Sequence, residues 1–276
     1  MPEGDTIHRA AATLRKVLEG QVVRSAALPR HQGPNLEAID GQRVASVRAS
    51  GKHLLIAFEN QLVLRSHMRM TGSWHLYRPG ERWRKPRARA RAALETSDWI
   101  AVCFNAPDVQ LLRSAANERA LAEVLGPDLL APEFDAAAVA RRWASVPELP
   151  IGVALMRQHL AAGIGNVYKS EVLFLQGIDP FAPVRQLSHS TLEGIAACAR
   201  SLMSANLGPG RRTTRRSLDG EPLWVYGRSG RPCRRCHTVV RMRRQGSDGR
   251  STYFCPICQA SGPATRAFQP GLESSG

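Results

Sequence analysis

Four of the six cysteines in this 276-residue chain have the spacing of a metal site. Cys233 and Cys236 form one Cys-x-x-Cys pair, Cys255 and Cys258 form another, and 18 residues separate the two pairs. This pattern is typical of a tetrahedral zinc site, in which four thiolates leave no coordination position open for substrate. We therefore predict one structural Zn²⁺ ion. Two redox-active dithiols are the alternative, but the sequence around them lacks a βαβ pattern.

Amine chemistry is restricted to very few positions. Of the 38 basic residues all but four are arginines, whose guanidinium stays protonated near neutral pH. The lysines are Lys16, Lys52, Lys85 and Lys169. An amine nucleophile must therefore be one of these lysines or the chain terminus. An α-amino group, with a pKa of ~8 against ~10.4 for lysine, is closer to its unprotonated form. If Met1 is removed, Pro2 presents that amine.

The charge balance points to a polyanionic partner. The chain has 38 basic and 23 acidic residues, a formal net charge of +15, and nucleic acid is the commonest partner of such a protein. Solvated surface charge without a specific partner is the alternative. No apolar run approaches the ~18 residues of a membrane span, and the N-terminus is not a signal peptide. We expect a cytoplasmic protein with no membrane association.

Hydrophobic periodicity divides the chain into successive regions. A first helix is predicted from apolar residues at 7, 11, 14 and 18, with Asp5 as its N-cap and Gly20 as its stop signal. Short strand-like runs follow from about 21 to 115, including a basic stretch over 82–91. Residues from about 131 to 206 have helical periodicity. The segment 246–249 is predicted to be the tip of a β-hairpin between the cysteine pairs.

A glycine-rich turn precedes one of the predicted helices. Gly163 and Gly165 lead to Asn166, which is a good N-cap, and the helix is expected to end at Gly177. Glycines before a helix N-terminus let backbone N–H groups approach an anion, and the helix dipole favours the anion there. The anion expected to bind here is a DNA phosphate. The alternative is that the motif forms only a tight turn.

Several motifs in order along the chain resemble the formamidopyrimidine-DNA glycosylase/endonuclease VIII family. They are Pro2-Glu3-Gly4-Asp5, Gly51-Lys52-His53, His67-Met68-Arg69-Met70-Thr71-Gly72, Gly126-Pro127-Asp128, 162–174, Val225-Tyr226-Gly227-Arg228 and 249–259. The resemblance implies an α+β multidomain fold. Its parts are an N-terminal β-sandwich with flanking helices (1–130), a helical helix–two-turn–helix domain (131–222), a zinc β-hairpin (223–261) and a flexible tail (262–276). It also implies a monomer that binds damaged DNA in the cleft between the domains.

The resemblance implies a bifunctional glycosylase and lyase of base excision repair. Pro2 would attack C1′ of a damaged nucleotide, expel the base and form an iminium, and Glu3 would exchange protons with the opening sugar. Lys52 would contact phosphate and assist base release. Arg250 would grip phosphates around the lesion and support δ-elimination, which follows β-elimination.

Three further residues correspond to DNA contacts of the family. Asn166 matches the phosphate-binding asparagine of the helix–two-turn–helix motif. Because chemistry on one nucleotide requires extruding it from the duplex, a side chain must fill the gap, and Met70 with Arg69 beside it occupies the family's wedge position. A core methionine at a strand end is the alternative for Met70.

Departures from the family pattern favour the endonuclease VIII-like branch and oxidised pyrimidines. Asn105-Ala106-Pro107 is followed by Asp108-Val109-Gln110 where enzymes for oxidised purines carry an Arg-Arg-Phe-type stretch. The stretch between Thr214 and Val225 is also shorter than the loop that caps 8-oxoguanine. Thr6 stands where many relatives have glutamate, and the gap between the zinc pairs is slightly long. The alternatives are the same chemistry on oxidised purines, or a zinc-containing DNA-binding protein with weak or no catalysis.

Overall fold

The computed structural model describes residues 2–29, 36–215 and 220–260. The predicted removal of Met1, the predicted tail over 262–276 and the middle of the short stretch before Val225 lie outside these residues. The chain forms two compact units, Met1–Leu125 and Gly126–Gly276, and the second contains both the helical region and the cysteine hairpin. The domain boundaries at 130 and 222 stay predictions.

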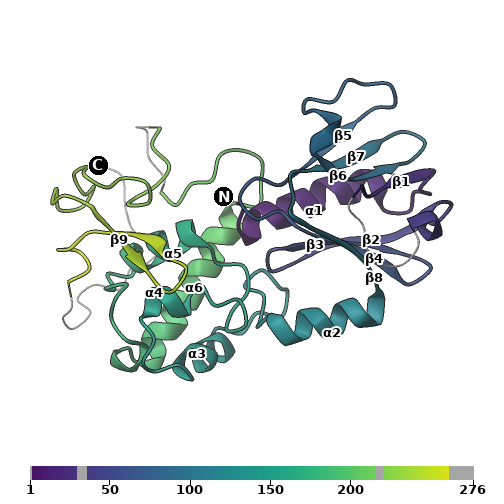
Figure 1. The fold of residues 1–276 in the computed structure, drawn as a ribbon. Coiled ribbons are helices and arrows are strands. Elements are labelled where there is room, and N and C mark those ends of the chain that lie inside the picture. The colour runs from purple at the N-terminus through teal and green to yellow at the C-terminus, as the bar shows by residue number, and fades with distance from the viewer. Residues whose placement is uncertain (1, 30–35, 216–219, 261–276) are drawn as a thin grey trace. The chain divides into compact units, whose positions relative to one another are not determined.

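The first unit is built on two four-stranded antiparallel sheets (Figure 1). In spatial order, the first sheet consists of β1 (Ser25–Ala27), β6 (Ala90–Glu95), β7 (Ile100–Phe104) and β5 (Ser73–Tyr77). The second consists of β2 (Val44–Ser50), β3 (His53–Phe58), β4 (Leu62–His67) and β8 (Asp108–Arg113). Apolar residues of both sheets belong to one buried core, which confirms the predicted sandwich.

Alternation along β3 shows how the second sheet is buried on both faces. Leu54 and Ile56 point into the core that the two sheets share, whereas Leu55 packs on the other face against Val63 and Leu121. Leu121 belongs to helix α2 (Ser114–Val124), which covers this outer face. Successive side chains of a strand point to opposite faces, so a continuous apolar run is what a strand covered on both sides requires.

The first helix, α1 (Gly4–Leu18), buries the four residues at 7, 11, 14 and 18 that predicted it. Gly20 follows it with a φ of +79°, consistent with the predicted stop signal. The predicted cap was wrong, because the N-cap is Glu3 and Asp5 lies buried in the first turn. Asp5 still places a negative charge near the positive end of the helix dipole.

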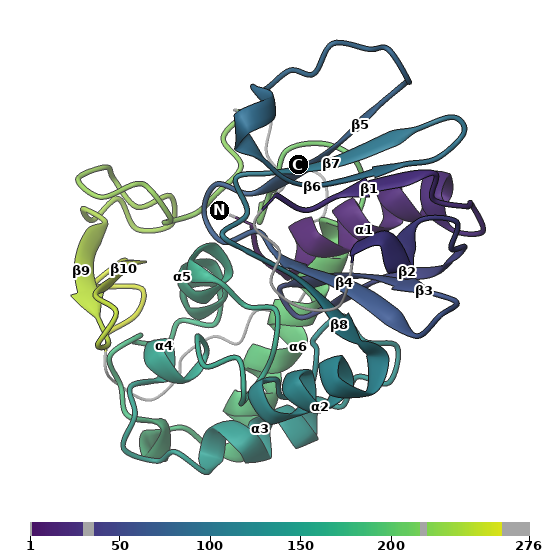
Figure 2. The same cartoon turned by 45° about the vertical axis from the view of Figure 1, so that its right-hand side comes forward.

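The second unit combines helices with a β-hairpin (Figure 2). Its helices are α3 (Ala136–Ala144), α4 (Ile151–Ala154), α5 (Asn166–Leu175) and α6 (His189–Ala205), and its strands are β9 (Arg241–Gln245) and β10 (Arg250–Phe254). α3 packs against α6, and β10 packs against α5. Asp135 caps α3 by accepting from two backbone N–H groups, and Ser188 caps α6.

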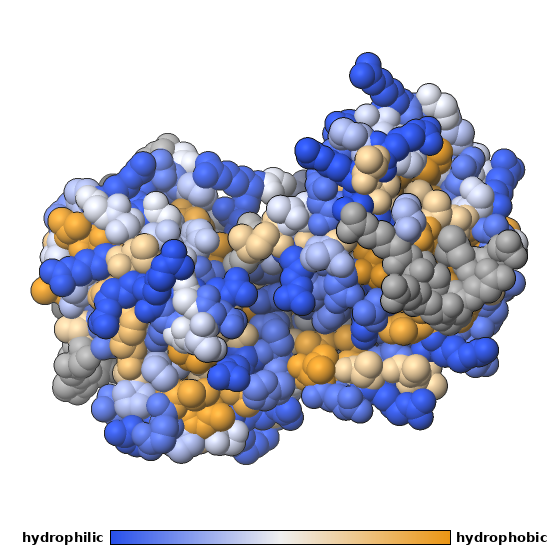
Figure 3. Space-filling model, in the orientation of Figure 1, coloured by the Kyte–Doolittle hydropathy of each residue, from blue (hydrophilic) through white to orange (hydrophobic). Residues whose placement is uncertain are grey.

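Short 3₁₀ segments complete the two units. They are η1 (Leu36–Ile39), η2 (Arg87–Arg89) and η3 (Val184–Gln186). Hydrophilic side chains dominate the face drawn in Figure 3. Among the described residues, every helix is too short or too polar to cross a membrane.

Candidate DNA-binding and catalytic site

One end of the second sheet gathers three segments that the sequence motifs singled out. Gly51 and Lys52 form the two-residue turn between β2 and β3, and Lys52 is half-buried there. His53 pairs with His67 across β3 and β4, and His67 pairs with Asp108 across β4 and β8. The Lys52 turn, the turn after His67 and the beginning of β8 therefore lie at the same end of the sheet.

The turn after β4 presents Met70 to solvent. Met70 is 61% exposed, while Met68 is 3% exposed and packs in the core. The backbone N–H of Gly72 donates to the Met68 carbonyl at 2.8 Å, and a Cβ at Gly72 would lie 2.5 Å from that same oxygen. Only glycine fits this closure. Arg69, with a φ of +49°, adopts the left-handed conformation that projects the tip. The core-methionine alternative therefore describes Met68 and not Met70.

Two histidines, His53 and His67, lie beside this tip. The rings of His53 and His67 meet edge-to-face with centroids 4.8 Å apart, and His67 Nδ1 accepts from the backbone N–H of Arg69 at 3.1 Å. Burial, together with the neighbouring His67, lowers the pKa of His53 to about 3. Burial and the adjacent Arg69 lower the pKa of His67 to about 4. Both imidazoles are therefore neutral near pH 7, and His67 keeps the acceptor that holds Arg69.

This histidine pair should make the first unit sensitive to acid. A histidine whose pKa is lowered on folding stabilises the native state fully above its unfolded pKa of ~6.5 and loses that contribution as the pH falls toward the folded value. For His53 we expect a loss on the order of 1–2 kcal/mol in unfolding free energy between pH 7 and 5. Urea unfolding followed by circular dichroism at several pH values measures it. His53→Leu should flatten the dependence and the exposed His189→Asn should not; equal slopes in all three proteins would contradict the assignment.

Pro2 and Glu3 lie at the N-terminal end of α1. The Glu3 carbonyl accepts from the backbone N–H groups of Thr6 and Ile7 at 2.9 and 3.1 Å, which places Pro2 immediately before the first helical turn. Glu3 is fully buried, whereas Pro2 is partly exposed. If Met1 is removed, this buried carboxyl lies next to an accessible terminal amine, an arrangement suited to proton exchange at a substrate bound to that amine.

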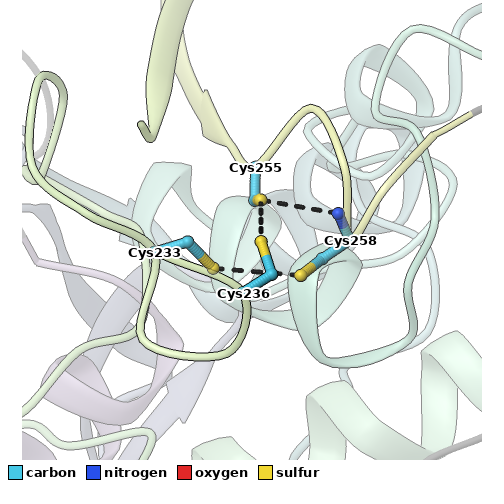
Figure 4. A group of neighbouring side chains, drawn as sticks. All are labelled: Cys233, Cys236, Cys255 and Cys258. Atoms are coloured by element: carbon cyan, nitrogen blue, oxygen red, sulfur yellow. Dashed lines mark hydrogen bonds between the residues drawn. The ribbon is translucent and has the colours of Figure 1, made fainter. Parts of the chain in front are cut away.

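The four paired cysteines form a compact cluster (Figure 4). All four sulfur atoms lie within 4.8 Å of one another, with Cys233 Sγ 3.8 Å from Cys258 Sγ and Cys236 Sγ 3.4 Å from Cys255 Sγ. Tetrahedral coordination with Zn–S bonds of about 2.3 Å places sulfurs roughly 3.8 Å apart. The cluster is therefore suited to a metal ion of zinc's size and softness.

The other two cysteines are apolar core residues, as their surroundings predicted. Cys103 is fully buried in the sandwich core, and Cys198 on α6 packs against the cores of the second unit. Burial raises the pKa of Cys103 to about 12 and that of Cys198 to about 11. Neither thiol is a nucleophile near neutral pH.

The arginines around the cysteine cluster divide into two groups. Arg228 is buried and donates to the carbonyls of Trp224 and Pro232 at 2.6 and 2.9 Å. The Arg235 guanidinium stacks 4.7 Å from the Phe174 ring centroid. These arginines hold the module together, whereas those of the hairpin strands are exposed; they are Arg241, Arg243, Arg244 and Arg250. A count of charges in the sequence does not separate the two kinds.

Helix α5 contacts the hairpin strand next to Arg250. Asn166 Nδ2 donates to Ser251 Oγ at 3.0 Å, so Asn166 lies beside the residue that follows Arg250. The predicted N-cap was wrong by one position: Gly165 is the N-cap and Asn166 is the first helical residue. Its side chain bonds the hairpin and not its own helix, and this separation of 85 residues is invisible to local capping rules. Gly177, with a φ of +68°, follows the helix as expected.

Glu171 is a buried acceptor that the sequence reasoning missed. It is fully buried on α5, and its carboxylate accepts from the backbone N–H groups of Trp224, Val225 and Tyr226 at 2.8–2.9 Å. The Thr214 hydroxyl also donates to it. Such charge-assisted hydrogen bonds offset burial of the carboxylate and fix the segment that enters the cysteine module. The available signal was a run of three polar residues, Lys169 to Glu171, inside a helix with apolar residues on both sides of the run, because all faces of a buried helix need partners.

Comparisons with known sequences extend along nearly the whole chain. The formamidopyrimidine-DNA glycosylase N-terminal domain model matches residues 1–108, and the formamidopyrimidine-DNA glycosylase H2TH domain model matches residues 125–217. A probable endonuclease 8 2 from Streptomyces coelicolor is 43% identical over 272 residues, covering 96% of both chains. The DNA-(apurinic or apyrimidinic site) lyase Nei2 of Mycolicibacterium smegmatis is 37% identical, covering 95% of this chain and all of that one.

Solved structures have the same fold. A formamidopyrimidine-DNA glycosylase from Lactococcus lactis, bound to DNA with an abasic site, superposes with a TM-score of 0.80 at 23% identity over 94% of this chain and all of that one. The protein from Thermus thermophilus gives 0.76 at 30% identity over 95% of this chain and all of its own. The chain belongs to the formamidopyrimidine-DNA glycosylase/endonuclease VIII family, the DNA glycosylases and abasic-site lyases of base excision repair.

Proposed function

We propose that this protein excises oxidised bases from DNA, preferentially oxidised pyrimidines, and then cleaves the strand by β,δ-elimination. The observation that carries the proposal is the position of Pro2 directly before a fully buried Glu3 at the start of α1, in a chain of this family. Lys52, Met70, Arg69, Asn166 and Arg250 are assigned to DNA contacts that assist this chemistry.

The chemistry begins at the Pro2 nitrogen. Its lone pair forms a bond to C1′, the glycosidic bond breaks, and the base leaves with that electron pair and takes up a proton. Glu3 delivers a proton to O4′ as the C1′–O4′ bond opens, and the nitrogen, having lost its own proton, is left as an iminium. The iminium acidifies a 2′ hydrogen, whose loss expels the 3′ phosphate. A further elimination expels the 5′ phosphate, and water finally hydrolyses the iminium and releases Pro2.

The lesion preference rests on the region of Asn105 to Gln110. Asn105 adopts a φ of +55°, and its carbonyl accepts from the Thr71 hydroxyl at 3.3 Å, so this turn lies against the Met70 turn. Gln110 accepts from Arg65 at 2.6 Å on the neighbouring strand β4. The segment therefore supplies no arginine and aromatic pair to face an orphaned base. The relatives named endonuclease 8 2 are also more similar, at 37–43% identity, than those named formamidopyrimidine-DNA glycosylase, at 31–32%.

A substrate panel tests this proposal directly. We expect excision of thymine glycol, dihydrouracil and 5-hydroxyuracil from duplex DNA to be faster than excision of 8-oxoguanine opposite cytosine. Sodium borohydride should trap the protein covalently on DNA that contains an abasic site. Trapping combined with preferential excision of 8-oxoguanine would replace pyrimidines with purines as the substrate class. Absence of any trapping, with DNA binding intact, would identify a DNA-binding protein that has lost catalysis.

The remaining assignments concern the metal and the state in which the protein acts. Cys233, Cys236, Cys255 and Cys258 would hold one structural Zn²⁺ ion, supported by the sulfur spacing. The ion would fix the hairpin that carries Arg250, and the protein would bind damaged DNA as a monomer. Four thiolate ligands leave the ion no open position, so its contribution is to folding.

A further inference from the structure

A cavity of about 140 Å³ lies in the second unit, between α4, α5 and the hairpin tip. Gly152 and Val153 of α4 form one wall, Lys169 of α5 forms another, and the loop over 246–248 closes it. A water molecule takes up about 30 Å³ in the liquid, so the cavity has room for several waters or for one oxyanion with fewer waters. Of the residues that line it, only Arg250 has a role assigned above.

The lining of this cavity, the Lys169 pocket, is electropositive. Three cationic side chains, Arg157, Lys169 and Arg250, line it with a single carboxylate, Asp248. Asp248 is 72% exposed on its side chain and stands 3.8 Å from Arg250 Nε, so water screens its charge. Lys169, in contrast, is 1% exposed. A concave site with an excess of one charge raises the local concentration of ions of the opposite sign.

Hydrogen bonds fix Lys169 against the hairpin. Its Nζ donates to the Ser251 carbonyl at 3.1 Å and to Thr252 Oγ1 at 2.8 Å. The hydroxyl of the next residue, Ser170, accepts from the backbone N–H of Tyr253 at 3.3 Å. The ammonium group therefore has a defined position next to the strand on which Arg250 lies. Lysine is a strongly hydrated point charge, and holding it in place lowers the ordering cost when it binds an anion.

The opposite wall is also closely packed, because α4 approaches the Gln245 side chain of the hairpin and the Pro180 carbonyl at Gly152. A Cβ at Gly152 would lie 2.5 Å from Gln245 Oε1 and 2.9 Å from the Pro180 carbonyl. Gln245 is itself held, since its Nε2 donates to the Pro180 carbonyl at 2.8 Å and its Oε1 accepts from Thr252 at 3.0 Å. The pocket is thus preformed and not a gap between mobile loops.

We propose that the Lys169 pocket binds a phosphate of the DNA backbone, with Lys169 and Arg157 as contacts additional to those assigned to Asn166 and Arg250. The proposal rests on the proposed function only in taking DNA as the partner. It is tested by binding to undamaged duplex, which requires no chemistry, so its failure and a failure of covalent trapping are separate results. Inorganic phosphate offers the same tetrahedral oxyanion and is the competing ligand.

The test is the salt dependence of DNA affinity for Lys169→Met and Arg157→Met. Each neutralised phosphate contributes about 0.9 to the slope of log K against log salt concentration, so the double variant should lower the slope by about that amount between 50 and 200 mM salt, and each single variant by a part of it. Lys16→Met is the matched control, because it removes the same charge from an exposed position on α1 and should leave the slope unchanged. Arg157 is exposed, so its variant stays informative if the Lys169 variant folds poorly.

Unchanged slopes in folded Arg157→Met and Lys169→Met would overturn the proposal and leave Lys169 with the structural role of holding the hairpin. A second measurement addresses the competing ligand, by recording the melting temperature with and without inorganic phosphate. If phosphate raises the melting temperature of wild type but not of the two variants, while their DNA slopes match wild type, the pocket binds a free anion. That outcome also overturns the assignment to DNA.

Discussion

Pro2→Gly should lower the rate of strand cleavage at an abasic site, and of borohydride trapping, by on the order of 10²-fold or more. Glycine keeps a terminal amine of similar pKa but changes its chemistry. A secondary amine forms an iminium that is permanently charged, whereas a primary amine forms an imine that must first gain a proton to withdraw electrons. Glycine also removes the fixed φ of proline and so loosens the nucleophile before α1. Single-turnover cleavage of abasic-site DNA measures the effect.

A chain with one additional glycine before Pro2 provides the sharper comparison. The Pro2 nitrogen then becomes an amide nitrogen with no nucleophilic lone pair, so trapping at this position should be lost completely while affinity for an uncleavable abasic analogue stays. The rival nucleophile is Lys52, and Lys52→Met should still trap, with the adduct on the N-terminal peptide. An adduct on a lysine peptide in wild type, or undiminished trapping by the extended chain, would remove Pro2 from the mechanism.

Local pattern was sufficient to predict much of this molecule. The four apolar positions of α1 and the cysteine pairs are spaced by helix periodicity and by metal geometry, and both are readable within a short window. The sequence also indicated some positions that require glycine, such as the residues that end helices. The reason for Gly72 is apparent only in the folded turn, where a Cβ would clash with the Met68 carbonyl. The features that the sequence predicted well are those that depend on residues close together along the chain.

The errors and omissions have the opposite origin, since each depends on a partner distant in sequence. Asn166 is a statistically good cap, but the hairpin, 85 residues further on, takes its amide. Glu171 reads as an ordinary polar residue of a helix, yet it accepts from three consecutive N–H groups more than 50 residues away. His53 and His67 become a neutral pair only when β3 and β4 align them. Tertiary contacts therefore determine the roles of these side chains. Hydrophobic periodicity carries no information about partners that are distant in sequence.

The second large effect is expected at the cysteine cluster. Cys255→Ser should eliminate zinc binding and lower DNA affinity by about 100-fold or more. Zinc binding by a four-thiolate site is worth on the order of 10 kcal/mol or more, and in a small module this energy is folding energy. The local core has few other apolar residues, including Phe174, Leu175, Val225 and Val240, and the cysteines themselves belong to it. Without the proposed ion, β9 and β10 would lose the anchor that presents Arg250 next to Asn166.

Cys198→Ser is the matched control for this effect. It makes the same chemical change at a partly buried thiol that packs near the module but lies outside the cluster. Metal analysis should find one zinc per chain in wild type and in Cys198→Ser, and none in Cys255→Ser. DNA binding should follow the zinc content, and a strong chelator should convert wild type to the behaviour of Cys255→Ser. Full DNA affinity in a zinc-free protein would show that the hairpin is held by its contacts with α5, through Ser251, Thr252 and Tyr253, without help from the metal.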